Sequence, residues 1–242
     1  FTFTPGVNYV VTKAPLTISA VTDTKVYDRD TASTALPTVS GLLSTDTVTG
    51  LVQAYADRNA GSGDKTLTVT AYTLTDGNGG ANYTVSTVAN TTGTITPKTL
   101  TAGLTGTVEK VYDGTTAATL AAGNYSLTGV IDGDTVTTSG TGAYDTKHTG
   151  TGKTVTADGL TLSGADKDNY TLAAMSTSAN IGVITPKAVT ITPDSGQTMV
   201  YNGATPAPTL TYTPDSALAA GEEFAGTLAL TDPARHAGTY AI

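Results

Sequence analysis

The sequence predicts an all-β protein made of small β-sandwich modules that follow one another in tandem. Threonine accounts for 54 of the 242 residues, about 22 %, and only 13 % of the residues are charged. Threonine is stiff at χ1 and favours strands, whereas a long helix needs charged side chains to solvate its outer face. Two further observations support the prediction. Apolar and threonine residues alternate, which indicates strands, and a set of sequence motifs recurs along the chain, which indicates tandem modules.

The motifs recur in a fixed order at a spacing of 84 residues from Leu16 to Leu100 and 89 residues from Leu100 to Val189. The recurring strings are Lys-Val-Tyr-Asp at 25–28 and 110–113 with Met-Val-Tyr-Asn at 199–202, Asn-Tyr-Thr at 82–84 and 169–171, and Ile-Thr-Pro-Lys at 95–98 and 184–187. Such a period is longer than that of a solenoid unit and suits a small, independently folding domain.

The repeat divides the chain into four segments. These are residues 1–14, the expected closing strand of a preceding module; residues 15–97 and 98–186, two complete modules; and residues 187–242, a third module expected to be truncated. The Thr-Pro-Lys junctions are short, and proline restricts their backbone. We therefore expect the modules to form a semi-stiff rod.

Seven short strands are predicted for the first complete module, in the order 16–20, 25–27, 36–41, 47–53, 66–74, 83–87 and 93–96. The fifth is the clearest, because Leu67, Val69 and Ala71 alternate with threonines. Seven strands in about 85 residues are typical of an immunoglobulin-like β-sandwich. Two weak helical candidates, Ala117–Ala122 and Ala217–Glu223, leave a β-grasp-like α+β module as the alternative.

Residues at equivalent places in successive modules are the expected structural anchors of the repeat. Tyr27, Tyr112 and Tyr201 are predicted to anchor the core of their own modules, because each combines a large apolar ring with a hydroxyl that can satisfy a backbone group. The remaining repeat anchors are Tyr83, Tyr170, Gly61, Gly150 and Gly238.

Composition excludes several classes of function. The net charge is −8 with only 12 lysines and arginines, which argues against nucleic acid as a partner, because phosphate binding needs clustered cations. The absence of cysteine excludes disulfides and thiolate sites. No apolar run reaches 18 residues, so we expect no membrane insertion.

The residues suggest neither an enzyme nor a cofactor protein. His148 and His236 occupy the same place in successive modules, where the first module has Asn59, so they are expected to lie a module apart and not to form a metal or catalytic pair. No catalytic triad order, phosphate loop or zinc motif is present. We therefore predict no catalytic and no cofactor-binding residues.

Calcium is the alternative for two acidic loops. Asp132 with Asp134, and Asp166 with Asp168, place oxygen ligands at i and i+2 as calcium loops do. However, aspartate in turns accounts for these residues without a metal.

The strings Lys-Val-Tyr-Asp-Gly-Thr-Thr at 110–116, Leu-Ser-Gly-Ala-Asp-Lys-Asp-Asn-Tyr-Thr-Leu at 162–172 and Ile-Thr-Pro-Lys at 184–187 resemble the YDG domain family. Such modules occur as tandem arrays in large bacterial surface adhesins of the filamentous-haemagglutinin kind. The first module departs from the motif, since Arg29 stands where the family has glycine. Residues 187–242 are similar to the MBG modules of the same proteins. The resemblance implies a secreted, bacterial cell-surface protein whose motif residues are structural.

The expected function is that of a non-catalytic stalk, which extends a cell-surface adhesin and projects a distal binding domain. Its expected partners are the neighbouring modules of the same chain. The alternative is an adhesive module that binds a host or matrix glycan or protein through exposed tyrosines.

Overall fold

The fold was analysed in a computed structural model that describes residues 6, 9–204, 208–231 and 237–242. The chain forms two compact units. Unit 1 comprises Phe1–Leu104, Tyr125–Gly140 and Asp158–Thr177, and unit 2 comprises Thr105–Asn124, Thr141–Ala157 and Ser178–Ile242. The only helical elements among the described residues are two single 3₁₀ turns, η1 (Ala122–Asn124) and η2 (Lys167–Asn169). The all-β prediction is therefore confirmed.

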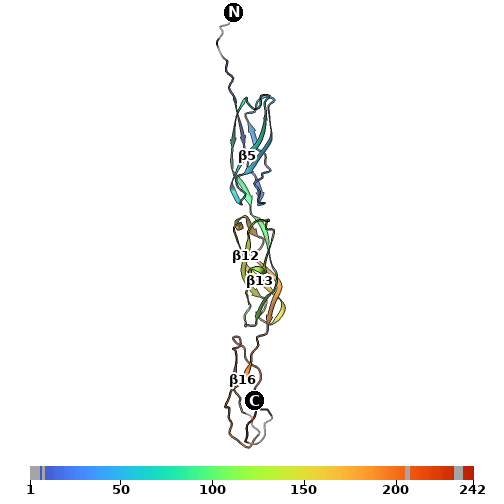
Figure 1. The fold of residues 1–242 in the computed structure, drawn as a ribbon, viewed down its shortest axis with the longest axis vertical. Helices are drawn as coiled ribbons and strands as arrows, with labels where there is room; N and C mark the ends of the chain where they lie inside the picture. The colour runs from blue at the N-terminus through green and yellow to red at the C-terminus, as the bar shows by residue number, and fades with distance from the viewer. Residues whose placement is uncertain (1–5, 7–8, 205–207, 232–236) are drawn as a thin grey trace. The chain divides into compact units, whose positions relative to one another are not determined.

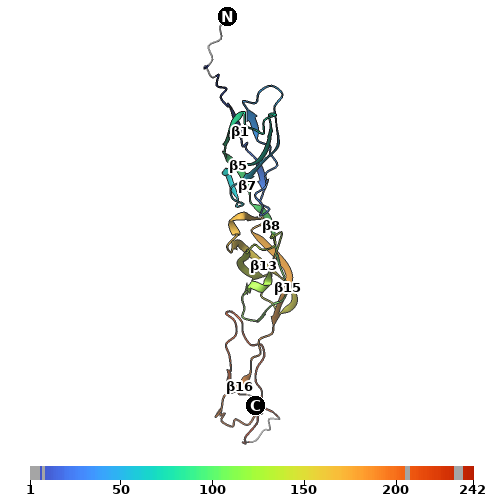
Figure 2. The ribbon, with the colours of Figure 1, turned by 45° about the horizontal axis from the view of Figure 1, so that its top comes forward.

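The first module is a sandwich of seven strands, as predicted. They are β1 (Ala14–Ser19), β2 (Thr24–Val26), β3 (Thr38–Ser40), β4 (Thr47–Tyr55), β5 (Gly61–Thr75), β6 (Tyr83–Val88) and β7 (Asn90–Thr96). One sheet has the order β3-β1-β6 and the other the order β2-β7-β5-β4. The long strand β5 runs alongside β4 and β7 (Figure 1), and Figure 2 shows β1, β5 and β7 within this one module. We call it module 1.

The core of module 1 lies between these sheets. One sheet contributes the buried side chains of Leu16 and Ile18 in β1. The other sheet contributes those of Leu67 in β5 and Ile95 in β7. On β5 the threonines next to Leu67 and Val69 are exposed or half-buried, so threonine forms the outer surface of this strand. This alternation fixes which face of the strand points to the core.

The second module repeats these pairings and is called module 2. Its strands are β8 (Lys98–Leu104), β9 (Val108–Val111), β10 (Ala117–Ala118), β11 (Tyr125–Thr128), β12 (Thr137–Tyr144), β13 (Gly150–Ser163), β14 (Tyr170–Leu172) and β15 (Ser176–Thr185). Its sheets have the orders β11-β8-β14 and β10-β12-β13-β15-β9. In module 1, β1 pairs in parallel with β6, and β2 pairs in parallel with β7. The equivalent parallel pairs in module 2 are β8 with β14 and β9 with β15.

The β-grasp alternative is wrong for these modules. Ala117–Ala122 contains the short strand β10 followed by a loop, and Ala217–Glu223 contains a loop and a turn. Neither segment packs a helix against a sheet, because alanines without an apolar stripe give a helix no face to bury.

In the third segment, the described residues form a two-stranded sheet of β16 (Ile191–Pro193) and β17 (Tyr212–Pro214). The predicted closing strand at residues 1–14 lies mostly outside the described residues, and residues 9–13 carry no strand. The four predicted segment boundaries, including that of the third module, stay predictions. Within the described part of the chain, no helix is long and apolar enough to cross a membrane.

Candidate functional site

The Lys-Val-Tyr-Asp string forms a tight loop that its own lysine holds together. In module 1, Lys25 Nζ lies 2.7 Å from Asp28 Oδ1 and donates to the carbonyl oxygens of Asp30 and Ala32 at 3.1 Å. The lysine stem also lies over the ring of Tyr55, with 5.9 Å between Nζ and the ring centroid. We call residues 25–28, with 110–113 of module 2, the tyrosine turn.

The tyrosine turn of module 2 has the same construction. Lys110 Nζ lies 2.7 Å from Asp113 Oδ1, donates to the carbonyl of Thr115 at 2.8 Å and lies 5.4 Å from the centre of the Tyr144 ring. The charge of Lys110 therefore compensates that of Asp113. The side chain of Val111, which lies between them in the sequence, is 57 % exposed. In both copies, the tyrosine N–H donates to the end of the neighbouring strand, Tyr27 to Thr96 and Tyr112 to Thr185, each at 2.8 Å.

Module 2 provides a hydrogen-bond acceptor, the carboxylate of Asp134, for the hydroxyl of Tyr27. The hydroxyl of Tyr170 accepts a hydrogen bond from the backbone N–H of Ile131 at 3.0 Å and donates to Asp134 Oδ2 at 2.6 Å. The backbone N–H of Asp134 in turn donates to the carbonyl of Ile131 at 3.0 Å. We call this arrangement of Ile131, Asp134 and Tyr170 the receiving site of module 2.

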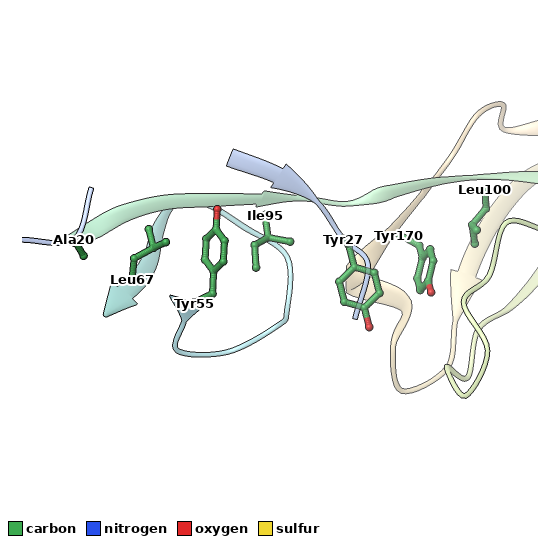
Figure 3. Packing of buried hydrophobic residues seen from close by; sticks show 7 residues of the cluster. All are labelled: Ala20, Tyr27, Tyr55, Leu67, Ile95, Leu100 and Tyr170. Atoms are coloured by element: carbon green, nitrogen blue, oxygen red, sulfur yellow. The ribbon is translucent and has the colours of Figure 1, made fainter. Parts of the chain in front are cut away.

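Tyr27 of module 1 occupies this receiving site, and both modules meet there inside unit 1. Its hydroxyl donates to Asp134 Oδ2 at 2.9 Å. Its ring meets that of Tyr170 edge to face, with centroids 5.4 Å apart and an interplanar angle of 76°, an arrangement that favours aromatic pairs. Figure 3 shows Tyr27 beside Tyr170 and Leu100 at one end of the buried cluster, with Ala20 and Leu67 at the other end. Tyr27 is only 1 % exposed.

A cation completes the receiving site. Arg29 Nε lies 3.3 Å from Asp134 Oδ1, and the arginine also donates to the carbonyl of Asp132. Burial raises the pKa of Tyr27 to about 12, and its hydrogen bond to the Asp134 carboxylate acts in the same direction. Burial alone would raise the pKa of Asp134, but hydrogen bonds from Tyr170 and Tyr27 and the charge of Arg29 hold it below its ordinary value. Asp134 is thus a buried anion whose Oδ2 accepts both phenol hydrogen bonds, while its buried Oδ1 has no hydrogen bond and lies at ion-pair distance from Arg29.

A second contact ties the same two modules together. The backbone N–H of Ala60 in module 1 donates to Asn169 Oδ1 at 2.8 Å, and Asn169 Nδ2 donates to Asn59 Oδ1 at 3.4 Å. Asn169 is 5 % exposed, so these bonds satisfy a buried amide that would otherwise carry a desolvation cost.

A related junction joins module 2 to the third segment inside unit 2. The hydroxyl of Tyr112 donates to Glu222 Oε1, and Lys147 Nζ lies 3.3 Å from the same oxygen. The hydrogen bond to Glu222, together with burial, raises the pKa of Tyr112. The bonds from Tyr112 and Lys147 lower the pKa of Glu222 in spite of its partial burial. At both junctions, a tyrosine of one tyrosine turn therefore meets a carboxylate and a cation.

The residue that follows the aspartate of the tyrosine turn is Gly114 in module 2 and Arg29 in module 1. The backbone and the neighbours at this position show why the two modules differ there. Gly114 has a φ of 77°, and a Cβ there would lie 2.5 Å from Cβ of Ala219 in the third segment. Arg29 takes the same left-handed backbone with a φ of 69°. A Cβ on the residue it faces, Gly133, would overlap the Arg29 guanidinium. The close approach to Ala219 thus favours glycine at position 114, whereas the guanidinium of Arg29 is the end of a flexible side chain and lies against Gly133.

The structure places the three predicted tyrosine anchors differently. Tyr27 belongs to the buried cluster that holds Tyr55 and Ile95 of its own module, and it also contacts module 2. Tyr112 is half-buried beside Glu222, and Tyr201 is 61 % exposed, so it anchors no core. The predicted anchors Tyr83 and Tyr170 are buried at 3 % and 5 % exposure.

Two core tyrosines and the charged partners of the junctions were missed from the sequence. Tyr55 and Tyr144 are 3 % and 4 % exposed and donate to backbone carbonyls of their own modules. Their spacing of 89 residues equals one repeat period and was the available signal. The sequence marks Arg29 only as a departure from the motif and does not mark Glu222, because the residues that they contact lie at least 75 positions away.

The glycine anchors fall into two kinds. Gly61 and Gly150 open the long strands β5 and β13, so they hold equivalent places in the two modules. Gly238 lies in an exposed bend outside any strand.

The calcium candidates have other partners. Asp134 Oδ2 accepts from Tyr170 and its Oδ1 lies 3.3 Å from Arg29 Nε. Asp166 Oδ2 accepts from the N–H of Thr135 at 2.8 Å, and Asp168 pairs with Lys167 at 2.5 Å. Asp132 contributes its carbonyl to Arg29. In the described ranges, no three histidine, aspartate or glutamate side chains are grouped to hold a metal ion. The absence of a cofactor stays a prediction; His236 lies outside the described residues.

Comparison with known families explains why the two modules share this geometry. The YDG domain family matches residues 12–92 and 96–178. The chain belongs to the YDG domain family. The two matches in tandem confirm the predicted repeat and the resemblance noted from the motifs. The similarity of residues 187–242 to MBG modules stays a prediction. Neither the comparison with curated proteins nor that with solved structures gives a match.

Proposed function

We propose that this pair of YDG modules is a non-catalytic extender of a secreted, bacterial cell-surface adhesin, and that it holds a distal binding domain away from the cell. The observation that supports the proposal is the junction within unit 1. There, a buried tyrosine of one module bonds to a buried carboxylate of the next. An extender must resist bending between its modules, and a peptide linker alone does not supply that resistance.

The chemistry of the junction suits this role. The bonds from the hydroxyls of Tyr27 and Tyr170 to Asp134 Oδ2 have a charged member, and bonds of that kind are about twice as strong as neutral ones. The tyrosine ring adds apolar burial beside Leu100 and Tyr170. Two independent contacts, at Asp134 and at Asn169, restrict both bending and twisting of module 1 against module 2.

Distance measurement between spin labels tests the proposal. The chain has no cysteine, so Thr68→Cys in module 1 and Thr128→Cys in module 2 place two labels at exposed sites of unit 1. We expect a narrow distance distribution in the full chain, and a broad one when Tyr27→Ala is added. Tyr72→Phe, which changes an exposed tyrosine, is the matched control. A broad distribution in the unsubstituted junction would contradict the extender role.

The glycan-binding alternative has less support. Sugar binding by stacking needs exposed rings gathered on one surface. The strongly exposed tyrosines among the described residues are Tyr9, Tyr72 and Tyr201, which come from three different parts of the chain. Binding of the full chain to a glycan array, lost on Tyr72→Ala, would favour the alternative instead.

A further inference from the structure

We propose that the end of module 1 formed by Leu43, Asp46 and Tyr83 is a second receiving site, built to dock the tyrosine turn of another YDG module joined ahead of it. This inference rests on the geometry of the repeat and does not depend on the extender role. The site lies on the part of module 1 that corresponds to the receiving site of module 2.

The two sites share their internal hydrogen bonds atom for atom. In module 1, the hydroxyl of Tyr83 accepts from the N–H of Leu43 at 2.9 Å and donates to Asp46 Oδ2 at 2.7 Å. The N–H of Asp46 donates to the carbonyl of Leu43 at 3.2 Å. The corresponding distances in the receiving site of module 2 are 3.0, 2.6 and 3.0 Å. The acceptor is therefore already formed in module 1.

What differs is the occupant. The side chain of Asp134 has no exposed surface, because Tyr27 and Arg29 cover it. Asp46 is half-buried, and within the described part of the chain Tyr83 is the only side chain that hydrogen-bonds to it. Leu43 beside it is 56 % exposed. The site thus presents a half-buried carboxylate and an exposed apolar side chain together, directly beside the buried ring of Tyr83.

A tyrosine turn fits each of these features. A phenol is a hydrogen-bond donor to the carboxylate, and its ring can pack edge to face on a second tyrosine. The exposed Leu43 offers the apolar contact that the half-buried Ile131 offers in module 2. The carboxylate also favours a cation from the docking module, as Arg29 and Lys147 provide at the two existing junctions.

The spacing between modules is compatible with this docking. In the native chain, Pro97 directly precedes Lys98, whose partner in β14 is Tyr170. Ala14 holds the same position in module 1, because its partner in β6 is Tyr83. A module that ends at Pro97 and is joined to Ala14 therefore meets the second receiving site with the native linker length.

The experiment extends the full chain with an added copy of residues 14–97 placed directly before Ala14. Spin labels go on Thr68→Cys of the added copy and Ser40→Cys of the original module 1. Ser40 pairs with Thr17 in β1 as Thr128 pairs with Thr101 in β8, so this label pair matches the native pair Thr68 and Thr128. We expect a narrow distance distribution centred where the native one is.

Two substitutions then assign the contact. Tyr27→Phe in the added copy and Asp46→Asn in the original copy should each cause loss of the narrow distribution, and the double variant should be no broader than either single one. Tyr72→Phe in the added copy should leave the distribution unchanged. A broad distribution in the extended chain, or single variants without effect, would overturn the inference. A narrow native pair beside a broad added pair overturns this inference alone and leaves the extender role standing.

Discussion

Replacing Tyr27 by phenylalanine removes one hydroxyl from the junction and keeps the ring. The edge-to-face contact with Tyr170 and the burial beside Leu100 are retained. What is lost is the donor at 2.9 Å from Asp134 Oδ2. A hydrogen bond to a charged group contributes about 1.5–3 kcal/mol. We therefore expect the variant to unfold with a free energy about 2 kcal/mol lower than that of the original chain.

Urea unfolding followed by far-UV circular dichroism measures this loss. For a slope of about 2 kcal/mol per molar urea, the midpoint falls by about 1 M. Tyr72→Phe is the control, because it removes an equal group from an exposed ring. Equal midpoints for the two variants would refute the idea that the hydroxyl carries the junction.

The pH dependence gives an independent test of the same bond. The pKa of Tyr27 is raised to about 12 in the folded chain from an ordinary value of 10. The folded state therefore keeps a proton that the unfolded state loses, so this stabilisation is complete below pH 10 and disappears as the pH rises to about 12. Two pKa units correspond to about 3 kcal/mol. The difference in stability between Tyr27→Phe and the original chain should shrink over this range, and a constant difference would count against the assignment.

Three more substitutions probe the repeat. Gly114→Ala should lower the free energy of unfolding by more than Gly77→Ala, because Gly77 has a similar positive φ but open space around it. Both substitutions carry the backbone cost of about 1–2 kcal/mol. Equal losses of stability in thermal melts would exclude the close contact at Gly114. Gln53→Leu should cost about 2–4 kcal/mol, because the fully buried amide bonds both backbone groups of one residue; an unchanged urea midpoint would contradict this. Hydrogen bonds from Lys110 and from the N–H and hydroxyl of Thr115 lower the pKa of Asp113 to about 2. Its contribution is complete above pH 3.8 and is lost as the pH falls to about 2, and carboxyl NMR should show Lys110→Met moving this pKa upward.

The strands of module 1 could be predicted because their signals are local. Alternation around Leu67 defines a strand face within a few residues, and the observed β5 contains the predicted strand 66–74. The closing strands followed from their apolar and threonine pattern in the same way. Only the ends of the strands differ from the prediction. Strand β5 is longer because it pairs with β4 and β7 beyond its periodic residues, whereas β3 is shorter than the predicted 36–41.

The module that the tyrosine turn contacts could not be predicted in this way. An apolar position shows that Tyr27 is buried, but not which module buries it. The partner Asp134 lies 107 residues away, and a turn-forming aspartate looks the same whether it faces solvent or a phenol. The sequence does show Asp46 and Asp134 as equivalent, since Asp-Thr-Val occurs at 46–48 and again at 134–136, and that equivalence is what reveals the second receiving site.

The parallel pairing of the outer strands has a mechanical consequence. In module 1, β1 pairs in parallel with β6 over Ala14–Ser19, and β2 pairs in parallel with β7. The chain enters at the start of β1 and leaves at the end of β7. Tension on the two ends therefore pulls paired strands along their length in opposite directions, so that the hydrogen bonds of each ladder are loaded in shear and must break together. Forced unfolding is governed by the unfolding rate, and module 2 repeats the same parallel ladders.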